Sequence, residues 1–455
     1  MLSYLSRAQY GYKGRYLVSA AVRADGSSRF GPDNKYGYFP SASVGWVVSE
    51  EPFMQHVPAI SILKLRASYG ISGNFKIGNY EYIGRLRADN YVAGVNEGTL
   101  AIGFAPATAD NSRLGWEKTA QQNVGIDVGF LKNTFALTVD VYNSNTSDLL
   151  LNVPVPEISG LSFLRQNIGK VNNKGIEVSL STNHQFGAFH LTNSANISAN
   201  RNRVVDLGGV SQLPLVTLDG GLRYITKVGK PIGSYYTLVQ EGVYTQAQID
   251  DPSVPKASNS RAGDFRFKDV NGDGKIDTND ANITGNYNPA YSFGLSSSLE
   301  FKGFDFSAIV QGVQGNQVVN LNKRYYASME SYGNNASNAL NRWLSDDQPG
   351  DGQTQRANRS ATGLTSSTST YHVEDASYVR VRNLTLGFTL PDATSTKLLI
   401  KKVRVYATAQ NPFISTKYSG YNPEVSNLND PQTPGLDYGT YPLAKSFLLG
   451  VHVTF

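Results

Sequence analysis

The chain has 455 residues, a formal net charge of +5 and no cysteine. The lack of cysteine excludes disulfides, thiolate metal sites and cysteine nucleophiles, and the mild, unclustered charge gives no reason to expect a nucleic acid partner. No run of 18 apolar residues occurs, so no helix is expected to span a bilayer. The 27 tyrosines, 20 phenylalanines and 44 glycines favour strands and turns over helices.

The N-terminal segment, MLSYLSRAQYGYKGRYLVSA, is expected to form a strand that ends in a turn. It has neither the apolar core nor the cleavage site of a signal peptide. We therefore expect the chain to be part of a longer protein.

Further along the chain, apolar and polar residues alternate on both sides of tight turns. In 122–141, for example, Val124, Ile126 and Val128 share one face, and Leu137 and Val139 resume that face after the turn. A period of two on hairpins predicts an antiparallel sheet with one apolar face. The same pattern recurs in 176–197 and 291–310. The short turns fall at 11–14, 131–134, 184–187 and 302–303.

Long polar segments alternate with these short turns, at roughly 73–115, 203–287, 318–373 and 414–440. Loops of this length are uncommon in compact soluble sandwiches. A transmembrane barrel of the outer-membrane type has tight turns at one end and long loops at the other. Tracing the chain up and down gives about 13 strands, and an odd number again indicates an incomplete barrel, because bacterial single-chain barrels have an even count. Alternation alone leaves a soluble β-sandwich open.

One strand, DASYVRVRNLTLGFTL at 375–390, breaks the alternation. Val379 and Val381 share one parity, whereas Leu384 and Leu386 share the other. A β-bulge near Arg382–Asn383 would bring all of them onto one face. The alternative is that the first part of the strand lies beyond the lipid, where parity is unconstrained.

The last ten residues, SFLLGVHVTF, alternate except at Leu448. We expect His452 and Thr454 to face a hydrated lumen, because a one-residue slip would turn five apolar side chains into water. The lipid-facing side chains are then Phe447, Leu449, Val451, Val453 and Phe455. An aromatic girdle is expected near the short-turn end. Its members would be Phe130, Phe135, Phe301 and Phe304.

The segment DVNGDGKIDTND, 269–280, matches the calcium loop pattern D-x-[DN]-x-[DN]-G. Gly274 would make the sharp turn, and hard oxygen ligands suit Ca²⁺ or, more weakly, Mg²⁺. An Asp at the twelfth position departs from the usual Glu, and its shorter arm weakens bidentate binding. The expected ligands are Asp269, Asn271, Asp273, Lys275 through its carbonyl, Asp277 and Asp280.

This loop has two other interpretations. The first is a plain Asn/Asp/Gly turn that caps a strand. The second is a calcium-dependent dockerin module, but a dockerin would continue into an amphipathic helix and a second loop copy. Here Ile283 leads into a strand, and no second copy exists.

Nothing in the sequence indicates an enzyme. Five scattered histidines, no cysteine and no G-x-S-x-G elbow leave no nucleophile–base pair to propose. The classes that remain are a transport barrel, a passive porin and a surface adhesin barrel.

Several blocks of the sequence resemble the C-terminal barrel portion of SusC/RagA-type TonB-linked outer-membrane transporters, a family found in Bacteroidota. No block is diagnostic alone, but their order is specific, and they run from one end of the chain, 1–455, to the other. They include VRADGSSRFGPDNKYGYFPSASVGW, LGWEKTAQQNVGIDVGFL, NIGKVNNKGIEVSLST, GDFRFKDVNGDGKIDTNDANITGNYNP and DASYVRVRNLTLGF.

This resemblance implies an all-β fold, part of a 22-stranded antiparallel barrel whose lumen is plugged. The plug, the signal peptide and the segment that contacts TonB are expected upstream of Met1. The implied function is energy-coupled import of glycans or peptides through the outer membrane of a Gram-negative bacterium. The implied partners are a SusD-like surface lipoprotein, the TonB complex, membrane lipid and the barrel-assembly machinery, which would read the C-terminal strand. Loop tyrosines such as Tyr235, Tyr236, Tyr325, Tyr326 and Tyr332 suit stacking on sugars, although packing is the more usual role.

Overall fold

The computed structural model describes residues 1–93, 98–161, 163–218, 221–330, 333–391, 400–425 and 432–455. The chain divides into two compact units. The first consists of 1–184, 192–214 and 227–229, and the second of 185–191, 215–226 and 230–455. In the described segments, no helix combines the length and the apolar character needed to cross a bilayer.

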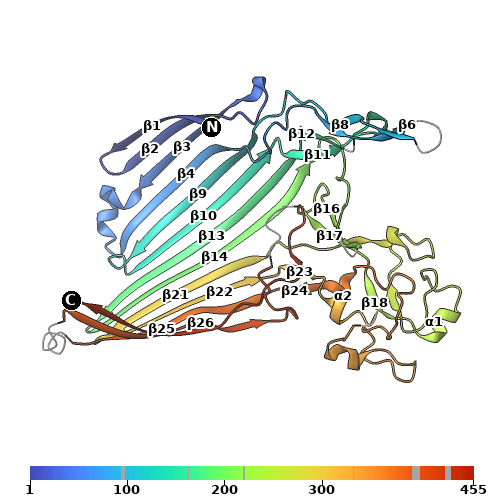
Figure 1. The fold of residues 1–455 in the computed structure, drawn as a ribbon. Coiled ribbons are helices and arrows are strands. Elements are labelled where there is room, and N and C mark those ends of the chain that lie inside the picture. The colour runs from blue at the N-terminus through green and yellow to red at the C-terminus, as the bar shows by residue number, and fades with distance from the viewer. Residues whose placement is uncertain (94–97, 162, 219–220, 331–332, 392–399, 426–431) are drawn as a thin grey trace. The chain divides into compact units, whose positions relative to one another are not determined.

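The first unit is built on long antiparallel strands that pair in chain order (Figure 1). Short turns connect these strands at one end of the sheet, whereas small hairpins extend the connections at the other end (Figure 1). The long strands are β1 (Leu2–Tyr12), β2 (Tyr16–Gly26), β3 (Tyr36–Val47), β4 (Ile60–Asn74), β9 (Glu117–Phe130), β10 (Phe135–Ser147), β13 (Lys170–Phe186) and β14 (Phe189–Asp206). The hairpins pair β5 (Arg85–Ala88) with β8 (Phe104–Thr108), β6 (Tyr91–Ala93) with β7 (Thr99–Ala101), and β11 (Leu150–Pro154) with β12 (Phe163–Asn167).

The second unit has five long antiparallel strands, also paired in chain order. They are β21 (Tyr291–Phe301), β22 (Phe304–Gln314), β25 (Tyr378–Thr389), β26 (Lys402–Thr416) and β28 (Ser446–Thr454). With the eight of the first unit, the described residues contain the thirteen long strands that the sequence predicts. The fold class, an all-β antiparallel sheet, is confirmed.

The long connections of the second unit fold into a compact region that we call the loop body, comprising 215–226, 230–290, 315–377 and 417–445 within the described residues. Its sheets are short, and β27 pairs in parallel with β23. One loop-body sheet contains β15 (Val216–Thr217), β16 (Arg223–Ile225), β17 (Ser234–Thr237) and β20 (Asn282–Gly285). Another contains β18 (Gln240–Val243) and β19 (Phe265–Phe267), and a further one contains β23 (Gln317–Asn320), β24 (Val373–Asp375) and β27 (Leu436–Asp437). The helices are α1 (Gln246–Asp250) and α2 (Lys323–Tyr326).

The β-bulge expected in β25 is present. Ile309 of β22 pairs with Asn383, but the next residue, Val310, pairs with Val381, so Arg382 is the extra residue. The pairing with β26 shifts at the same point. The bulge therefore places Val381 on the same face as Leu384, as the parity conflict predicts.

The C-terminal strand β28 keeps its apolar residues on one face, except for Leu448, which pairs with Thr408 on the other. Leu449 pairs with Ala407 and Val451 with Val405, and the side chain of Leu449 is 88% exposed. On the other face Tyr406 lies over Gly450, where a Cβ would collide with its ring. The face assignment expected from the sequence agrees with this register.

None of the phenylalanines assigned to the girdle belongs to a buried core. Phe130 pairs with Phe135, and Phe301 pairs with Phe304, so each pair shares a face next to its turn. Phe301 also stacks on Phe189 at a ring distance of 3.8 Å. Their membership of a membrane girdle stays a prediction.

Most buried apolar side chains gather at the loop-bearing ends of the long strands and in the loop body. In the first unit Phe30, Phe39 and Trp116 form the centre of one cluster. In the second unit Tyr224 and Tyr235 lie in a cluster of the loop body. The long strands leave large apolar side chains exposed over much of their length. An apolar sheet face that no protein layer covers is typical of a transmembrane sheet and not of a soluble sandwich.

Candidate functional site

On the polar face of the long sheet in the first unit, one arginine bridges two carboxylates. Arg66 of β4 donates to both oxygens of Asp127 on β9, at 2.8 and 3.0 Å, and to both oxygens of Asp140 on β10, at 3.0 and 2.9 Å. Gly125 makes this possible, because a Cβ there would lie 2.5 Å from Asp140 and 2.7 Å from the guanidinium. A fork of fixed donors between two carboxylates is the geometry for which arginine is best suited.

The second unit uses the same device. Arg404 of β26 forms a bidentate ion pair with Asp305 of β22 across the intervening strand β25. A Cβ on Gly387 of β25 would lie 2.5 Å from both partners. Alternation places these residues at polar parity but does not pair them. The signal that could have found the pairs is an Arg and an Asp at polar parity on strands that flank a glycine.

A polar groove of about 630 Å³ lies beside Arg66 on this face. Its lining includes Asn123, Asp140, Tyr142 and Glu177, and the hydroxyl of Tyr142 lies 3.1 Å from the Asn200 side chain. Arg66 and Asp140 are paired across strands, and amide and hydroxyl side chains line most of the remaining surface. Such a wall suits a hydrated surface.

In the second unit, Glu424 joins a long loop to the strands. Its carboxylate receives both terminal nitrogens of Arg380, at 2.8 and 2.9 Å, and the side-chain amide of Gln311 at 2.8 Å. The hydroxyl of Tyr378 donates to the same carboxylate. Arg380 reaches this face because the bulge at Arg382 reverses the parity of β25.

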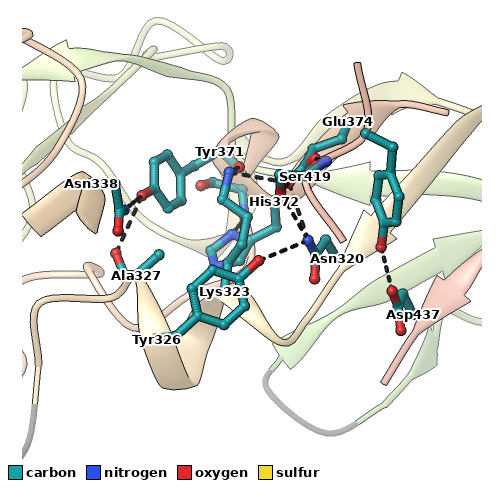
Figure 2. Close-up of polar contacts among 12 residues, drawn as sticks. Asn320, Lys323, Tyr326, Ala327, Asn338, Tyr371, His372, Glu374, Ser419 and Asp437 are labelled. Carbon is teal, nitrogen blue, oxygen red and sulfur yellow. Dashed lines mark hydrogen bonds and ion pairs between the residues drawn. The ribbon is translucent and has the colours of Figure 1, made fainter. Parts of the chain in front are cut away.

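A buried polar network joins three separate segments of the loop body (Figure 2). Lys323 of α2 donates to the carbonyl of Tyr371, lies 3.8 Å from the centre of its ring, and lies 3.5 Å from Glu374 of β24. Burial lowers the pKa of Lys323, and Glu374 opposes that shift. The ammonium of Lys323 is therefore held by the Glu374 carboxylate, the face of the Tyr371 ring and the Tyr371 carbonyl.

The same network fixes the last connection of the chain. Ser419 donates its backbone amide and its hydroxyl to Glu374, both at 2.8 Å. The fully buried Asn320 of β23 lies 3.2 Å from Glu374, and the hydroxyl of Tyr418 donates to Asp437 of β27 (Figure 2). Burial and the Asp437 carboxylate raise the pKa of Tyr418. These contacts make the loop body a folded element and not a set of free loops.

His372, in the 3₁₀ helix Thr370–His372, lies at the centre of this network and is 3% exposed. Its Nδ1 accepts the backbone amide of Ser369, and the ring packs edge-on against Tyr371. Burial, with the nearby charges of Lys323 and Arg324, lowers the pKa of His372 to about 3. The imidazole is neutral at physiological pH.

We expect the loop body to lose about 2 kcal/mol of stability between pH 7 and pH 5, from about 1.4 kcal/mol per unit of pKa difference. The unfolded histidine binds a proton near its ordinary pKa, whereas the folded one resists protonation until about pH 3. Stability is thus present above the unfolded pKa and falls as the pH drops. Hydrogen-exchange free energies of the loop-body amides, corrected for intrinsic rates, measure this. In His372→Asn the dependence should flatten; an equally steep profile in that variant would contradict the assignment.

In the segment 269–280 every Asp and Asn side chain of the calcium pattern accepts a hydrogen bond from a backbone amide of the same segment. Asp269 accepts the amides of Gly272 and Gly274, at 2.6 and 2.9 Å, and Asp280, which is fully buried, accepts those of Val270 and Asp277. The amide of Gly274 is the largest cause that lowers the pKa of Asp269; burial opposes it, and the amide of Gly272 lowers the pKa further.

The remaining expected ligands cap this loop as well. Asn271, Asp273 and Asp277 each accept a backbone amide two residues ahead, and Lys275 donates its own amide to Asp273. In the part of the chain that the structure describes, no group of three or more His, Cys, Asp or Glu side chains is arranged to hold a metal ion. Ion binding here stays a prediction.

The loop tyrosines divide by exposure. Tyr235 is fully buried and donates to the carbonyl of Gln317, so it packs in the core. Tyr325 is 64% exposed and its hydroxyl lies 2.8 Å from that of Tyr438. Tyr236 and Tyr326 are half-buried. Tyr332 lies outside the described residues.

Comparison with protein families gives one match that covers most of the chain. Residues 4–412 match the family model described as TonB dependent receptor-like, beta-barrel. The match includes all the long strands except the last, the first two residues of β1 and the end of β26.

Similar full-length proteins give the same result. A TonB-dependent receptor of Formosa agariphila is 34% identical over all of this chain and 46% of its own length. The TonB-dependent receptor SusC of Bacteroides thetaiotaomicron is 32% identical over all of this chain and 44% of its own length. A solved structure of the RagAB peptide transporter matches with a TM-score of 0.81 and 27% identity, over all of this chain and 47% of that one. The chain spans about half the length of the curated relatives it matches.

Proposed function

Since the chain belongs to the TonB-dependent receptor β-barrel family, in its SusC/RagA-type branch, we propose that it forms barrel wall and outer loops of an outer-membrane nutrient importer. The observation that carries this proposal is the contrast between the two faces of each sheet. One face is apolar and uncovered, and the other carries charged residues, some of which form ion pairs across strands. A wall of this kind separates lipid from a hydrated lumen.

The cargo is a soluble oligosaccharide or peptide that enters from the loop side. The similar structure named as a peptide transporter supports a peptide, and a glycan is the alternative that the resemblance to the SusC/RagA family implies. A SusD-like lipoprotein docks on the loop body, and the TonB complex supplies the energy. The buried network around Lys323 supports this role, because a docking partner needs a folded surface and not free loops.

The test uses the full-length protein in its native bacterium. A strain without the gene should fail to grow on the cognate oligosaccharide or peptide as sole nutrient, and re-expression should restore growth. Uptake of the labelled nutrient should stop when a protonophore removes the proton gradient, and a tagged protein should retain an outer-membrane lipoprotein on purification. Uptake that is insensitive to the protonophore would instead indicate a passive porin.

We also propose that segment 269–280 binds Ca²⁺ through Asp269, Asn271, Asp273, Asp277, Asp280 and the carbonyl of Lys275. Three features of the segment suit a hard cation. The oxygen donors have the calcium-loop spacing, the lowered pKa of Asp269 keeps its carboxylate ionised, and Gly274 adopts a φ of +79° at the sharp turn. Calcium titration of the full-length protein by calorimetry should show one site that Asp273→Asn weakens at least tenfold. The matched control is Asp251→Asn, in the same loop body but outside the pattern. If Asp273→Asn gave the same heats of calcium binding as the wild-type protein, the segment would be a capping turn and not an ion site.

A further inference from the structure

A second groove, of about 600 Å³, lies on the apolar-parity face of the first sheet, opposite to the polar groove. Its floor is formed by Val124, Val141 and Ile176, which are 63, 52 and 44% exposed. Lys174 of β13 and Arg201 of β14 line its other end. The groove is thus apolar on one side and cationic on the other.

The two cations are unpaired. Within the described residues, neither Lys174 nor Arg201 forms an ion pair, and both side chains are exposed. No acidic residue lines the groove. Arg203, two residues further along β14 at the same parity, is also exposed and extends the positive charge. Unpaired cations beside an uncovered apolar surface suit a ligand that carries both acyl chains and an anionic group.

The position of the groove along the strands indicates which ligand this is. On β10 the apolar row begins at Phe135 beside the short turn and ends at Val141, and Asn143 follows at the groove. Eight residues at about 3.4 Å each, tilted by about 40°, rise roughly 20 Å along the membrane normal. A barrel's apolar band is about 25 Å tall. Lys174, which pairs with Asn143, therefore lies near the boundary on the loop side.

We propose that this groove binds one phosphorylated, multiply acylated lipid of the lipid A class. Lys174 and Arg201 hold its phosphate, and its acyl chains lie along Val124, Val141 and Ile176. Charge-assisted contacts between a phosphate and cations at a membrane boundary favour such a headgroup. This lipid site rests on the proposed function, because it requires that the chain forms part of an outer-membrane barrel. It does not depend on which cargo is imported.

The experiment measures lipid retained by the full-length protein purified in mild detergent. Native mass spectrometry with added bisphosphorylated lipid A should show one bound lipid in the wild-type protein. Lys174→Gln with Arg201→Gln should lower the bound fraction at least tenfold. The matched control, Arg7→Gln with Lys64→Gln, removes the same charge from the opposite, polar face and should leave binding unchanged.

Two further arms identify the chemistry. Dephosphorylated lipid A should bind at least tenfold more weakly, and inorganic phosphate alone should not compete. The proposal is overturned if the groove variant binds lipid A as well as the wild-type protein does, or if the polar-face control loses as much. Loss of lipid with unchanged nutrient uptake would support the lipid site, and failure of uptake with intact lipid binding would count only against the transport proposal.

Discussion

Replacing Val178 by arginine should destabilise the folded barrel by about 2–4 kcal/mol, the cost of a cation on the lipid face near the bilayer midplane. Val178 pairs with Val139, midway along the apolar row of β10. Its neighbour Ser179 pairs with Thr138 on the polar face at the same depth. Ser179→Arg should therefore cost less than about 1 kcal/mol, because that side chain enters water.

The free energy of unfolding in urea, measured on the full-length protein in lipid vesicles, compares these two variants directly. The pair is matched in chain position, depth and added charge, and only the face differs. Equal costs for Val178→Arg and Ser179→Arg would contradict the assignment of the two faces.

Replacing Arg66 by methionine should cost about 2–4 kcal/mol, because two facing carboxylates then lose their shared partner. Four hydrogen bonds disappear, and Asp127 and Asp140 are left partly buried on adjacent strands. Arg66→Lys should recover only part of the loss, since an ammonium keeps the charge but not the fork of donors.

The control for this prediction is a triple variant. Asp127→Asn and Asp140→Asn added to Arg66→Met remove the repulsion and should return more than half of the lost stability. Unfolding in urea again provides the measurement. If the triple variant is less stable than Arg66→Met alone, the carboxylates do not repel and the explanation is wrong.

Much of the fold could be predicted because side-chain parity is a local signal. The conflict between Val381 and Leu384 predicted the bulge at Arg382, and the structure places it there. The short turns at 131–134 and 302–303 followed from alternation that stops and resumes on the same face. A period of two constrains each strand without any knowledge of its neighbours.

The loop body could not be predicted, because its contacts join segments that are far apart in the chain. Tyr235 shares its hydroxyl between the carbonyls of Gln317 and Gly435. The network around Lys323 likewise needs Glu374 and Ser419 to meet. The hairpin of β11 and β12, in the connection 148–169, was also missed, since its short strands carry no clear alternation.

The candidate site shows the same division. The spacing in 269–280 is local, so the sequence identified the pattern and the turn. The partners of Arg66 depend on the register of three strands, and a long connection separates β4 from β9. Side-chain parity places Arg66 on a polar face, but it does not identify the two carboxylates that bind the arginine.

The central claim is that odd and even residues of these strands face water and lipid alternately, and cysteine scanning along β13 tests it most directly. Residues 1–455 contain no cysteine, so single cysteines at 176–181 can be introduced one at a time in the full-length protein after any cysteines outside this chain have been replaced by serine. A membrane-impermeant thiol reagent should label positions 177, 179 and 181, and a bilayer-confined quencher should reach a probe at 176, 178 and 180. Uniform labelling, or the opposite phase, would contradict the account.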